Sequence, residues 1–350
     1  MGSPVDDYER SFNQYKCQNY LLGKSLIILV RNIASFVILV FLWLRHFIGR
    51  EYSFESLKTG NKSVFLYEST NIDILPCSLS HNVDIVGLNG PLFFDEKCRD
   101  IIKNLWKRYP FSYFFILKNA IKIGRYGYVK LHYAPDRIIS SCEYSFTSSV
   151  LTCYCEESGI QHINVMHGEK LFNIRDAFCR FSTFYVWDEH YISLFNKLRA
   201  SESVFIVEQP PAACLENNRT ECKKRDYTFY LAVETETTLR RLQEVTRVLE
   251  EQGKTFLIRP HPRYTDMAML KSYFSCAAIE MPQSVGIKES LQETRHAVAR
   301  FSTVLYQAYN SGVVAVIDDV TDPLRYEALK EEEYIMLQKT DFRLSQIIVQ

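Results

Sequence analysis

The stretch KTFLIRPHPRYTD, residues 254–266, joins a short strand to a stiff turn that carries three basic side chains. Its apolar run, Phe256–Ile258, is typical of a buried strand. A proline stands on each side of His261, and because proline fixes φ and lacks a backbone N–H, the turn is rigid. The outer neighbours of these prolines are Arg259 and Arg263. An imidazole and two guanidiniums at the end of a strand predict a site for an anion.

Strands and helices alternate on either side of this turn in the second half of the chain. The predicted strands are 227–233, 254–258, 297–301 and 313–317, and the predicted helices are 238–252, 304–310 and 323–333. This order predicts a parallel sheet covered by helices on both faces. Ligands bind such sheets beyond the carboxyl ends of the strands, which is where His261 lies.

The first half of the chain shows the same alternation. The predicted strands are 63–67, 83–88, 137–141 and 163–166, and the predicted helices are 95–108 and 146–157. The polar, proline-bearing stretch 208–226 is predicted to be a linker. The simplest architecture is α/β, with two Rossmann-like domains that face a cleft. The predicted divisions are an N-terminal segment 1–50, a first domain 51–215 and a second domain 216–350.

The N-terminal segment contains an apolar run that follows Lys24 and is broken only by Arg31 and Asn32. The longest uninterrupted piece, Ile33–Leu44, is too short to cross a bilayer, and an arginine inside a span is costly. We expect residues 25–49 to form an amphipathic or apolar helix in the interface of the inner leaflet, with its arginines reaching toward the lipid phosphates. The alternative is a helix that is buried against the main body of the protein.

Composition and missing motifs exclude several classes of function. Lys plus Arg and Asp plus Glu both number 41, so no basic face predicts nucleic-acid binding. The ten cysteines show no disulfide framework, and Cys153 and Cys155 have the wrong spacing for a zinc or CxxC motif, so reduced thiols in a cytosolic protein fit best. The sequence has no Walker A, GxGxxG, GxSxG or HExxH motif and no early acidic pair for a metal. We therefore expect neither a cofactor nor a metal.

Two further groups in the second domain extend the anion site. Ser302 and Thr303 lie where a predicted strand passes into a helix, and hydroxyls and N–H groups at a helix N-terminus favour a phosphate. The same pair would also serve as an ordinary helix cap. Glu289 lies between the two groups and could accept hydrogen bonds from a ribose diol. Taken alone, Glu289 is better explained as a solvated glutamate at the start of a helix.

The order His261, Glu289, Ser302 resembles the donor site of the bacterial sialyltransferases and polysialyltransferases with the GT-B fold. In those families an HP motif and a Ser-Ser or Ser-Thr pair hold the CMP phosphate, and a glutamate between them binds the ribose. The resemblance covers residues 227–320. It implies a CMP-sugar donor, inversion and no metal, with the arginines beside the HP motif assisting.

A second resemblance lies in the first domain. The stretch INVMHGEK, residues 163–170, ends a strand in a His-Gly-Glu turn that is similar to the His-Gly turn of GT-B enzymes that build capsule and teichoic-acid-like polymers. Residues 184–195, FYVWDEHYISLF, resemble the next strand and helix of those families. The resemblance implies that His167 or Glu169 faces the cleft opposite His261 and deprotonates the acceptor hydroxyl. The alternative is a buried histidine that bonds to backbone.

The sequence departs from the polysialyltransferases in one respect. Their acidic-acidic-Gly motif, which carries the base, is absent in that form. The His-Gly-Glu turn or Glu143 must substitute, and Glu68, Glu234 and Glu236 are further candidates. The choice among these residues stays open at the level of sequence.

Together these features predict a cytoplasmic glycosyltransferase that is peripheral on the inner face of the membrane. It would use a CMP-activated sugar, a sialic acid or Kdo, to build capsule or lipopolysaccharide, with His261 stabilising the departing phosphate. Its partners would be the nucleotide-sugar donor, a glycan or glycolipid acceptor and the membrane surface. The alternatives are a polyol-phosphate transferase of the CDP-glycerol type and an inactive GT-B scaffold that recruits other polymer enzymes.

Overall fold

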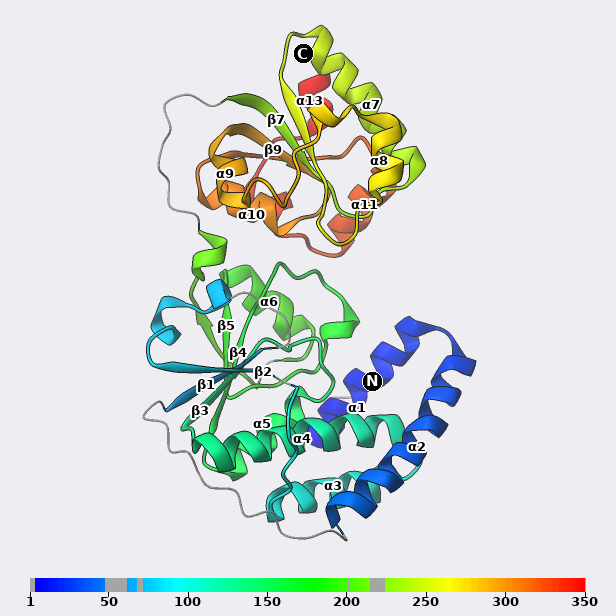
Figure 1. Cartoon of the computed structure of the whole chain (residues 1–350), viewed down its shortest axis with the longest axis vertical. Helices are drawn as coiled ribbons and strands as arrows, with labels where there is room; N and C mark the ends of the chain where they lie inside the picture. The colour runs from blue at the N-terminus through cyan, green and yellow to red at the C-terminus, as the bar shows by residue number, and fades with distance from the viewer. Residues whose placement is uncertain are drawn as a thin grey trace. The chain divides into compact units, whose positions relative to one another are not determined.

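The structure, a computed structural model, describes residues 4–47, 62–67, 72–87, 89–200, 202–214 and 224–349. The chain forms two compact units, which Figure 1 shows. The N-terminal unit comprises Met1–His167 and Asn173–Pro210, and the C-terminal unit comprises Gly168–Phe172 and Pro211–Gln350. The inserted segment, Gly168–Phe172, therefore belongs to the second unit although its sequence neighbours on both sides belong to the first.

The N-terminal unit contains a parallel sheet with six strands among the described residues, in the order β2-β1-β3-β4-β5-β6. The strands are β1 Ser63–Tyr67, β2 Val83–Gly87, β3 Arg137–Ser140, β4 Gln161–Val165, β5 Thr183–Val186 and β6 Val204–Val207. Phe65 of β1 lies opposite Ile85 on one side and Ile139 on the other. Phe65 and Ile139 are fully buried, as expected for strands of a parallel sheet that helices cover.

Four helices accompany this sheet along the chain. They are α3 Glu96–Arg108, α4 Tyr113–Tyr133, α5 Ser148–Glu157 and α6 Glu189–Lys197. The helix α4 was not predicted from the sequence, and it contains two glycines at points of close contact. A Cβ on Gly127 would collide with the Phe93 carbonyl oxygen, and a Cβ on Gly124 would crowd the Phe94 ring. The glycines thus let the segment before α3 lie directly against α4.

Two helices precede the sheet, α1 Asp7–Leu22 and α2 Ser25–Phe47. α1 begins after Asp6, whose side chain accepts a hydrogen bond from the Glu9 N–H, and ends at Gly23, which has a φ of 62°. The second helix, α2, confirms the predicted apolar helix. Its central asparagine fastens it to the α3–α4 connection, because the Asn32 side chain donates to the Phe111 carbonyl at 2.7 Å and accepts from the Phe114 N–H at 3.0 Å.

The position of Arg31 corrects the prediction that the arginines of this helix reach outward. Its guanidinium donates to Asn19 Oδ1 at 2.6 Å and lies 3.9 Å from the centre of the Phe114 ring. The alternative holds only in part: α2 contacts the rest of the unit through Asn32 and Leu39, but only 11% of Ser25–Arg45 is buried. With a mean hydropathy of 2.4, this is the one helix in the described part of the chain that is long and apolar enough to cross a membrane.

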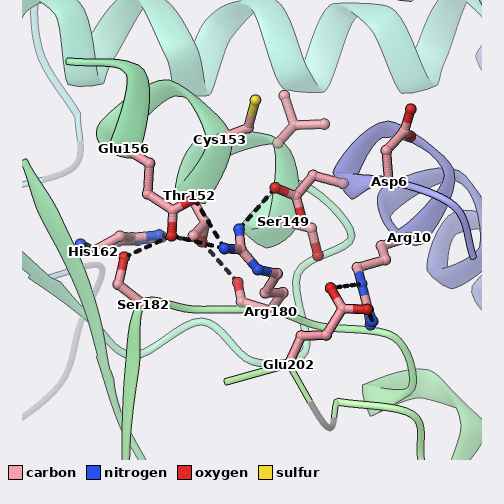
Figure 2. Close-up of polar contacts among 12 residues, drawn as sticks. Asp6, Arg10, Ser149, Thr152, Cys153, Glu156, His162, Arg180, Ser182 and Glu202 are labelled. Carbon is pink, nitrogen blue, oxygen red and sulfur yellow. Dashed lines mark hydrogen bonds and ion pairs between the residues drawn. The ribbon is translucent and has the colours of Figure 1, made fainter. Parts of the chain in front are cut away.

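A cluster of charges ties α1 to the rest of the N-terminal unit (Figure 2). Arg180 donates to both carboxylate oxygens of Glu156 on α5, at 2.8 and 2.9 Å, and to Asp7 of α1 at 2.8 Å. Arg10 of α1 is almost fully buried and pairs with Glu202. Because these pairs join α1 to α5 and to the chain around β5 and β6, α1 is an integral part of this unit.

The C-terminal unit contains a second parallel sheet, with four strands among its described residues in the order β10-β9-β7-β8. The strands are β7 Arg225–Tyr230, β8 Phe256–Arg259, β9 Thr294–Ala299 and β10 Val314–Ile317. The helices are α7 Glu236–Glu251, α8 Met267–Tyr273, α9 Ile287–Gln292, α10 Thr303–Asn310, α11 Pro323–Glu331, α12 Met336–Lys339 and α13 Leu344–Ile348. All four predicted strands of this half and the three predicted helices are present, with ends shifted by a few residues.

The predicted fold class is confirmed: the chain is α/β, with one parallel sheet in each unit and an apolar N-terminal helix. Two Rossmann-like units are the components of the GT-B fold. The division of the chain has two features that the predicted boundaries lack. The C-terminal unit begins at Pro211, and it also includes the inserted segment.

Asp7 gives the N-terminal unit a testable dependence on pH. Burial raises the pKa of Asp7 from 3.8 to about 6, although the Arg180 charge opposes the rise. The folded state therefore binds this proton more tightly than the unfolded state does. Protonated Asp7 stabilises the folded state fully below pH 3.8, and this stabilisation is lost as the pH rises through about 6. We expect the free energy of unfolding of the unmodified protein to fall by up to about 3 kcal/mol between pH 4 and pH 8 because of Asp7. In Asp7→Asn this contribution to the fall should be absent.

Urea unfolding at the two pH values measures this difference. The matched control is Asp136→Asn, because Asp136 is largely exposed in its pair with Lys62. If Asp7→Asn and the unmodified protein show the same pH dependence, the assignment to Asp7 is wrong.

Candidate functional site

A cavity of about 690 Å³ lies at the carboxyl ends of the strands in the C-terminal unit. Its walls come from the segments that follow β7, β8 and β9 and from the first turn of α10. Four of the six predicted donor residues line it: Arg259, His261, Ser302 and Thr303. The structure thus brings the HP turn and the Ser-Thr pair together at the edge of the sheet where α/β proteins bind ligands.

His261 is held in one orientation by its own turn. The Arg263 N–H donates to Nδ1 of His261 at 3.1 Å, and the ring stacks on Tyr264 with 4.4 Å between centres. The His261 N–H donates to the Thr265 hydroxyl at 2.8 Å, and that hydroxyl donates to the Ala232 carbonyl at 3.1 Å. Because Nδ1 accepts a hydrogen bond, the proton of the neutral ring resides on Nε2.

The charge state of His261 follows from its surroundings. Burial, and then the nearby Arg263 charge, lower the pKa of His261 below its ordinary value of 6.5. The ring is therefore neutral at pH 7, with Nε2–H as a donor on a residue that lines the cavity. Such a group can hydrogen-bond a phosphate oxygen without carrying a full charge.

The N-terminus of α10 forms another wall of the cavity. Ser302 is the N-cap, and its hydroxyl accepts from the Val304 N–H at 3.2 Å. This is the ordinary capping role, but the hydroxyl proton can still be donated to a ligand. Thr303, the first residue of the helix, also lines the cavity. Since the positive end of the helix dipole lies here, an anion in the cavity is favoured.

Arg259 lines the cavity but is committed to a buried ion pair. Its Nη1 lies 2.6 Å from Glu280 Oε1, and its Nη2 donates to the Val285 carbonyl at 2.8 Å. Glu280 also pairs with Arg225. Burial would raise the pKa of Glu280, but hydrogen bonds from Ser290 and the two arginines hold it below its ordinary value. Arg259 therefore stabilises the end of β8 and has few donors left for a phosphate.

Two other predicted donor residues are exposed and lie outside the lining of the cavity. Arg263 is on the outer side of the HP turn and contributes its backbone N–H to His261. Glu289 is in the first turn of α9, and the α9 residue that reaches the cavity is Ile287. The HP turn, the glutamate and the Ser-Thr pair thus follow one another in the sequence as in the resemblance. Only the HP turn and the Ser-Thr pair line the same cavity. The roles of Arg263 and Glu289 stay predictions.

The remaining glutamates of the second domain have structural partners. Glu234 is almost completely buried, pairs with Arg300 and accepts from the Ala232 N–H at 3.1 Å. Glu236 is exposed in the first turn of α7 and pairs with Arg240 at 3.1 Å. Glu68 lies outside the described residues. The contacts of Glu234 and Glu236 indicate a turn and a helix start and do not favour a catalytic base.

Glu169 belongs to the inserted segment and lies buried in the C-terminal unit. Burial raises its pKa well above the ordinary range, with the Tyr334 hydroxyl partly opposing the rise. Burial therefore favours the neutral form of Glu169. A buried, protonated carboxyl is a poor general base, so the geometry favours His167 over Glu169 for that role.

His167 and Glu143 lie together in the N-terminal unit. His167 Nδ1 is 3.0 Å from Oε1 of Glu143, which is completely buried. Oε2 of Glu143 accepts from the Asn164 side chain at 3.0 Å, and Gln14 of α1 donates to the Glu143 carbonyl at 2.9 Å. The imidazole is 30% exposed, so this residue is not the fully buried histidine of the alternative interpretation.

This pair has the chemistry of an oriented base. A carboxylate beside Nδ1 favours the tautomer with its proton on that nitrogen. Nε2 of His167 is then left with a lone pair that can accept a proton. The arrangement would allow His167 to act as a base that Glu143 orients.

Three residues at this cavity or bonded to its lining were not predicted from the sequence: Tyr264, Thr265 and Tyr334. Tyr264 and Thr265 stand in the quoted stretch, and a threonine shortly after the HP motif was an available signal, because hydroxyls often satisfy turn backbone. The Ser302 N–H donates to the Tyr334 hydroxyl at 3.5 Å. It follows α11 in sequence, and no spacing rule connects it to Ser302.

We expect Arg259→Met to lower the stability of the C-terminal unit by about 1.5–3 kcal/mol, because Glu280 loses a charged hydrogen-bond partner in a buried site. Urea unfolding of the full chain measures this loss. The matched control is Arg263→Met, which removes an exposed guanidinium and should change the free energy of unfolding by less than about 0.5 kcal/mol. Equal stability of the two variants would contradict the structural role of Arg259.

The chain was compared with known proteins. No protein-family model and no curated protein sequence matches it. Among solved structures, S. aureus MnaA bound to UDP is 10% identical, with a TM-score of 0.45 and coverage of 77% of this chain and 87% of that chain. A glycotransferase of kitacinnamycin is 9% identical, with a TM-score of 0.44 and coverage of 78% and 85%. The wall teichoic acid polymerase TagF, soaked with CDPG, is 8% identical, with a TM-score of 0.41 and coverage of 92% and 89%.

Proposed function

We propose that this protein is an inverting glycosyltransferase of the GT-B type that uses a CMP-activated sugar and no metal. The observation that carries the proposal is the cavity of the C-terminal unit, which both a neutral histidine donor and the N-terminus of α10 line. Its product would be a surface glycan such as capsule or lipopolysaccharide.

The donor phosphate would be held by neutral donors and a helix dipole. His261 would donate from Nε2, and the Ser302 and Thr303 hydroxyls would donate from the other wall. When the bond to the sugar breaks, negative charge develops on the phosphate oxygens of the departing nucleotide. Donors that are already fixed in place stabilise that charge without reorganisation, which lowers the barrier by several kcal/mol.

The acceptor hydroxyl would be activated by His167. Nε2 of His167 takes the hydroxyl proton as the oxygen attacks the anomeric carbon from the face opposite the nucleotide, so the configuration inverts. Glu143 holds the ring and stabilises the imidazolium that forms. The segment that follows His167 in the sequence belongs to the C-terminal unit. His167 is followed by Gly168, and a Cβ on Gly168 would lie 3.5 Å from the Thr303 hydroxyl.

The location and the donor are also part of the proposal. The exposed apolar face of α2 supports a protein that is peripheral on the inner face of the membrane. A phosphate clamp of this kind would also suit CDP-glycerol, because CMP is the leaving group there as well. The clamp therefore supports a CMP leaving group but does not distinguish a sugar from glycerol phosphate as the group transferred. Measuring which donor the protein consumes, a CMP-sugar or CDP-glycerol, distinguishes these two alternatives.

Calorimetric titration with CMP, UDP, GDP and CDP tests the clamp. We expect CMP to bind, and we expect His261→Ala to weaken that binding and to lower kcat by roughly 10²-fold, the effect of losing one oxyanion-type donor. The matched control is His81→Ala, because His81 is an exposed histidine of the N-terminal unit. Binding of none of the four nucleotides, or equal CMP binding by His261→Ala, would show that the HP turn is only structural.

The base is tested separately from the donor site. We expect His167→Asn to lower kcat by roughly 10²- to 10⁴-fold while CMP binding is kept, because the C-terminal unit retains the clamp. Glu143→Gln should give a smaller loss in kcat, since it removes the orienting charge and not the base. Unchanged turnover by a folded His167→Asn protein would assign the base elsewhere. CMP binding without turnover in the unmodified protein, with every donor tested, would favour the scaffold alternative.

A further inference from the structure

The N-terminal unit contains an apolar cavity of about 550 Å³ between α2, α3 and α4. Leu39, Leu42 and Trp43 line it from α2, and Ile102 and Trp106 line it from α3. Its volume lies in the range of small-molecule sites, roughly 300–1,000 Å³. No residue of this cavity belongs to the proposed donor site or to the His167–Glu143 pair.

Two cations stand among the apolar residues that line the cavity. They are Arg99 and Lys103, which are four residues apart on α3 and therefore on the same face of that helix. Ile102 and Trp106 continue this face, so α3 presents a stripe that combines apolar groups with two positive charges. Among the described lining residues there is no carboxylate. A ligand that matches this lining has a hydrocarbon part and a negative charge.

The cavity opens beside the exposed face of α2. The side chains of Val40, Phe41 and Trp43 are 42%, 61% and 55% exposed, and Val40 and Trp43 also line the cavity. The apolar surface is thus continuous from the outer face of the helix into the cavity. Exposed apolar side chains on α2 thus lie beside cations on α3, and this is the combination that binds at the boundary between lipid head groups and acyl chains.

We propose that this cavity binds an anionic phospholipid of the bilayer, with one acyl chain between α2 and α3 and the lipid phosphate at Arg99 and Lys103. Guanidinium and ammonium groups are the natural partners of a phosphate. The acyl chain would cover the apolar lining, which water otherwise contacts. The site would add a specific contact with one lipid to the general attraction between α2 and the interface. This inference is independent of the function proposed for the cavity of the C-terminal unit.

The positions of the tryptophans provide the test. Trp43 is on α2, Trp106 lines the cavity, and Trp187 is buried in the sheet region, where its Nε1–H donates to the Met166 carbonyl. In Trp43→Phe, the accessible tryptophan is therefore Trp106. We expect vesicles of phosphatidylcholine and phosphatidylglycerol with brominated acyl chains to quench its fluorescence, because bromine quenches on contact. Lack of quenching when the protein is bound to the vesicles would overturn the proposal.

A pair of charge variants tests the role of the cations. We expect Arg99→Gln/Lys103→Gln to weaken binding to vesicles with phosphatidylglycerol by roughly 30-fold, since it removes two charged hydrogen-bond donors to the phosphate of the bound lipid. Binding to pure phosphatidylcholine should not change. The matched control is Lys97→Gln/Lys107→Gln, which removes the same charge from α3 at positions that do not line the cavity.

Two results would contradict the proposal at this stage. Equal weakening by both charge pairs would indicate general attraction to the surface and no site. Sedimentation could instead reveal a dimer that buries α2 and stays intact when lipid is added. That result would assign the apolar face to a second copy of the chain. Circular dichroism of each variant confirms that the helices are kept.

Discussion

Parallel pairing of the strands is the constraint on which the site depends. Every named strand in the described residues pairs in parallel with its neighbours, in both sheets. Parallel strands cannot be joined by a tight hairpin, so a helix or a long connection returns the chain each time, and all carboxyl ends meet at one edge. In the C-terminal unit this places the turn after β8 next to the start of α10. His261 and Ser302 are distant in sequence, and they line one cavity for this reason.

Much of the fold could be predicted because its strands are short apolar runs bounded by turn residues. The strands around Phe65, Ile139 and Ile258 are examples, and each of these residues is fully buried. β6 was missed because it is an edge strand that adjoins the polar linker, and it is mostly exposed. α4 was missed because its glycines weaken the helical pattern, and only the structure reveals that they make room for Phe93 and Phe94.

The site could be predicted only as far as chemistry is local in sequence. The HP turn and the Ser-Thr pair were found because strand ends and helix starts are visible in the residue order. The commitment of Arg259 to Glu280 was not visible, since an ion pair between distant residues leaves no pattern in one sequence. The two histidines show the same limit. Nδ1 of His261 accepts from backbone, whereas Nδ1 of His167 faces a carboxylate, and the sequence does not reveal this difference between the two rings.

The inserted segment has a consequence for the order in which the protein forms during synthesis. Gly168–Phe172 leaves the ribosome in the middle of the N-terminal unit, yet the Phe172 N–H donates to the Glu332 carbonyl, close to the end of the chain. The first sheet can be completed once β6 has emerged, whereas this segment must wait until α11 has been made. Until then Glu169 lacks Tyr334 and the other parts of the C-terminal unit that bury it. The burial that raises its pKa is therefore completed only at the last stage of folding, once the residues that follow α11 have been made.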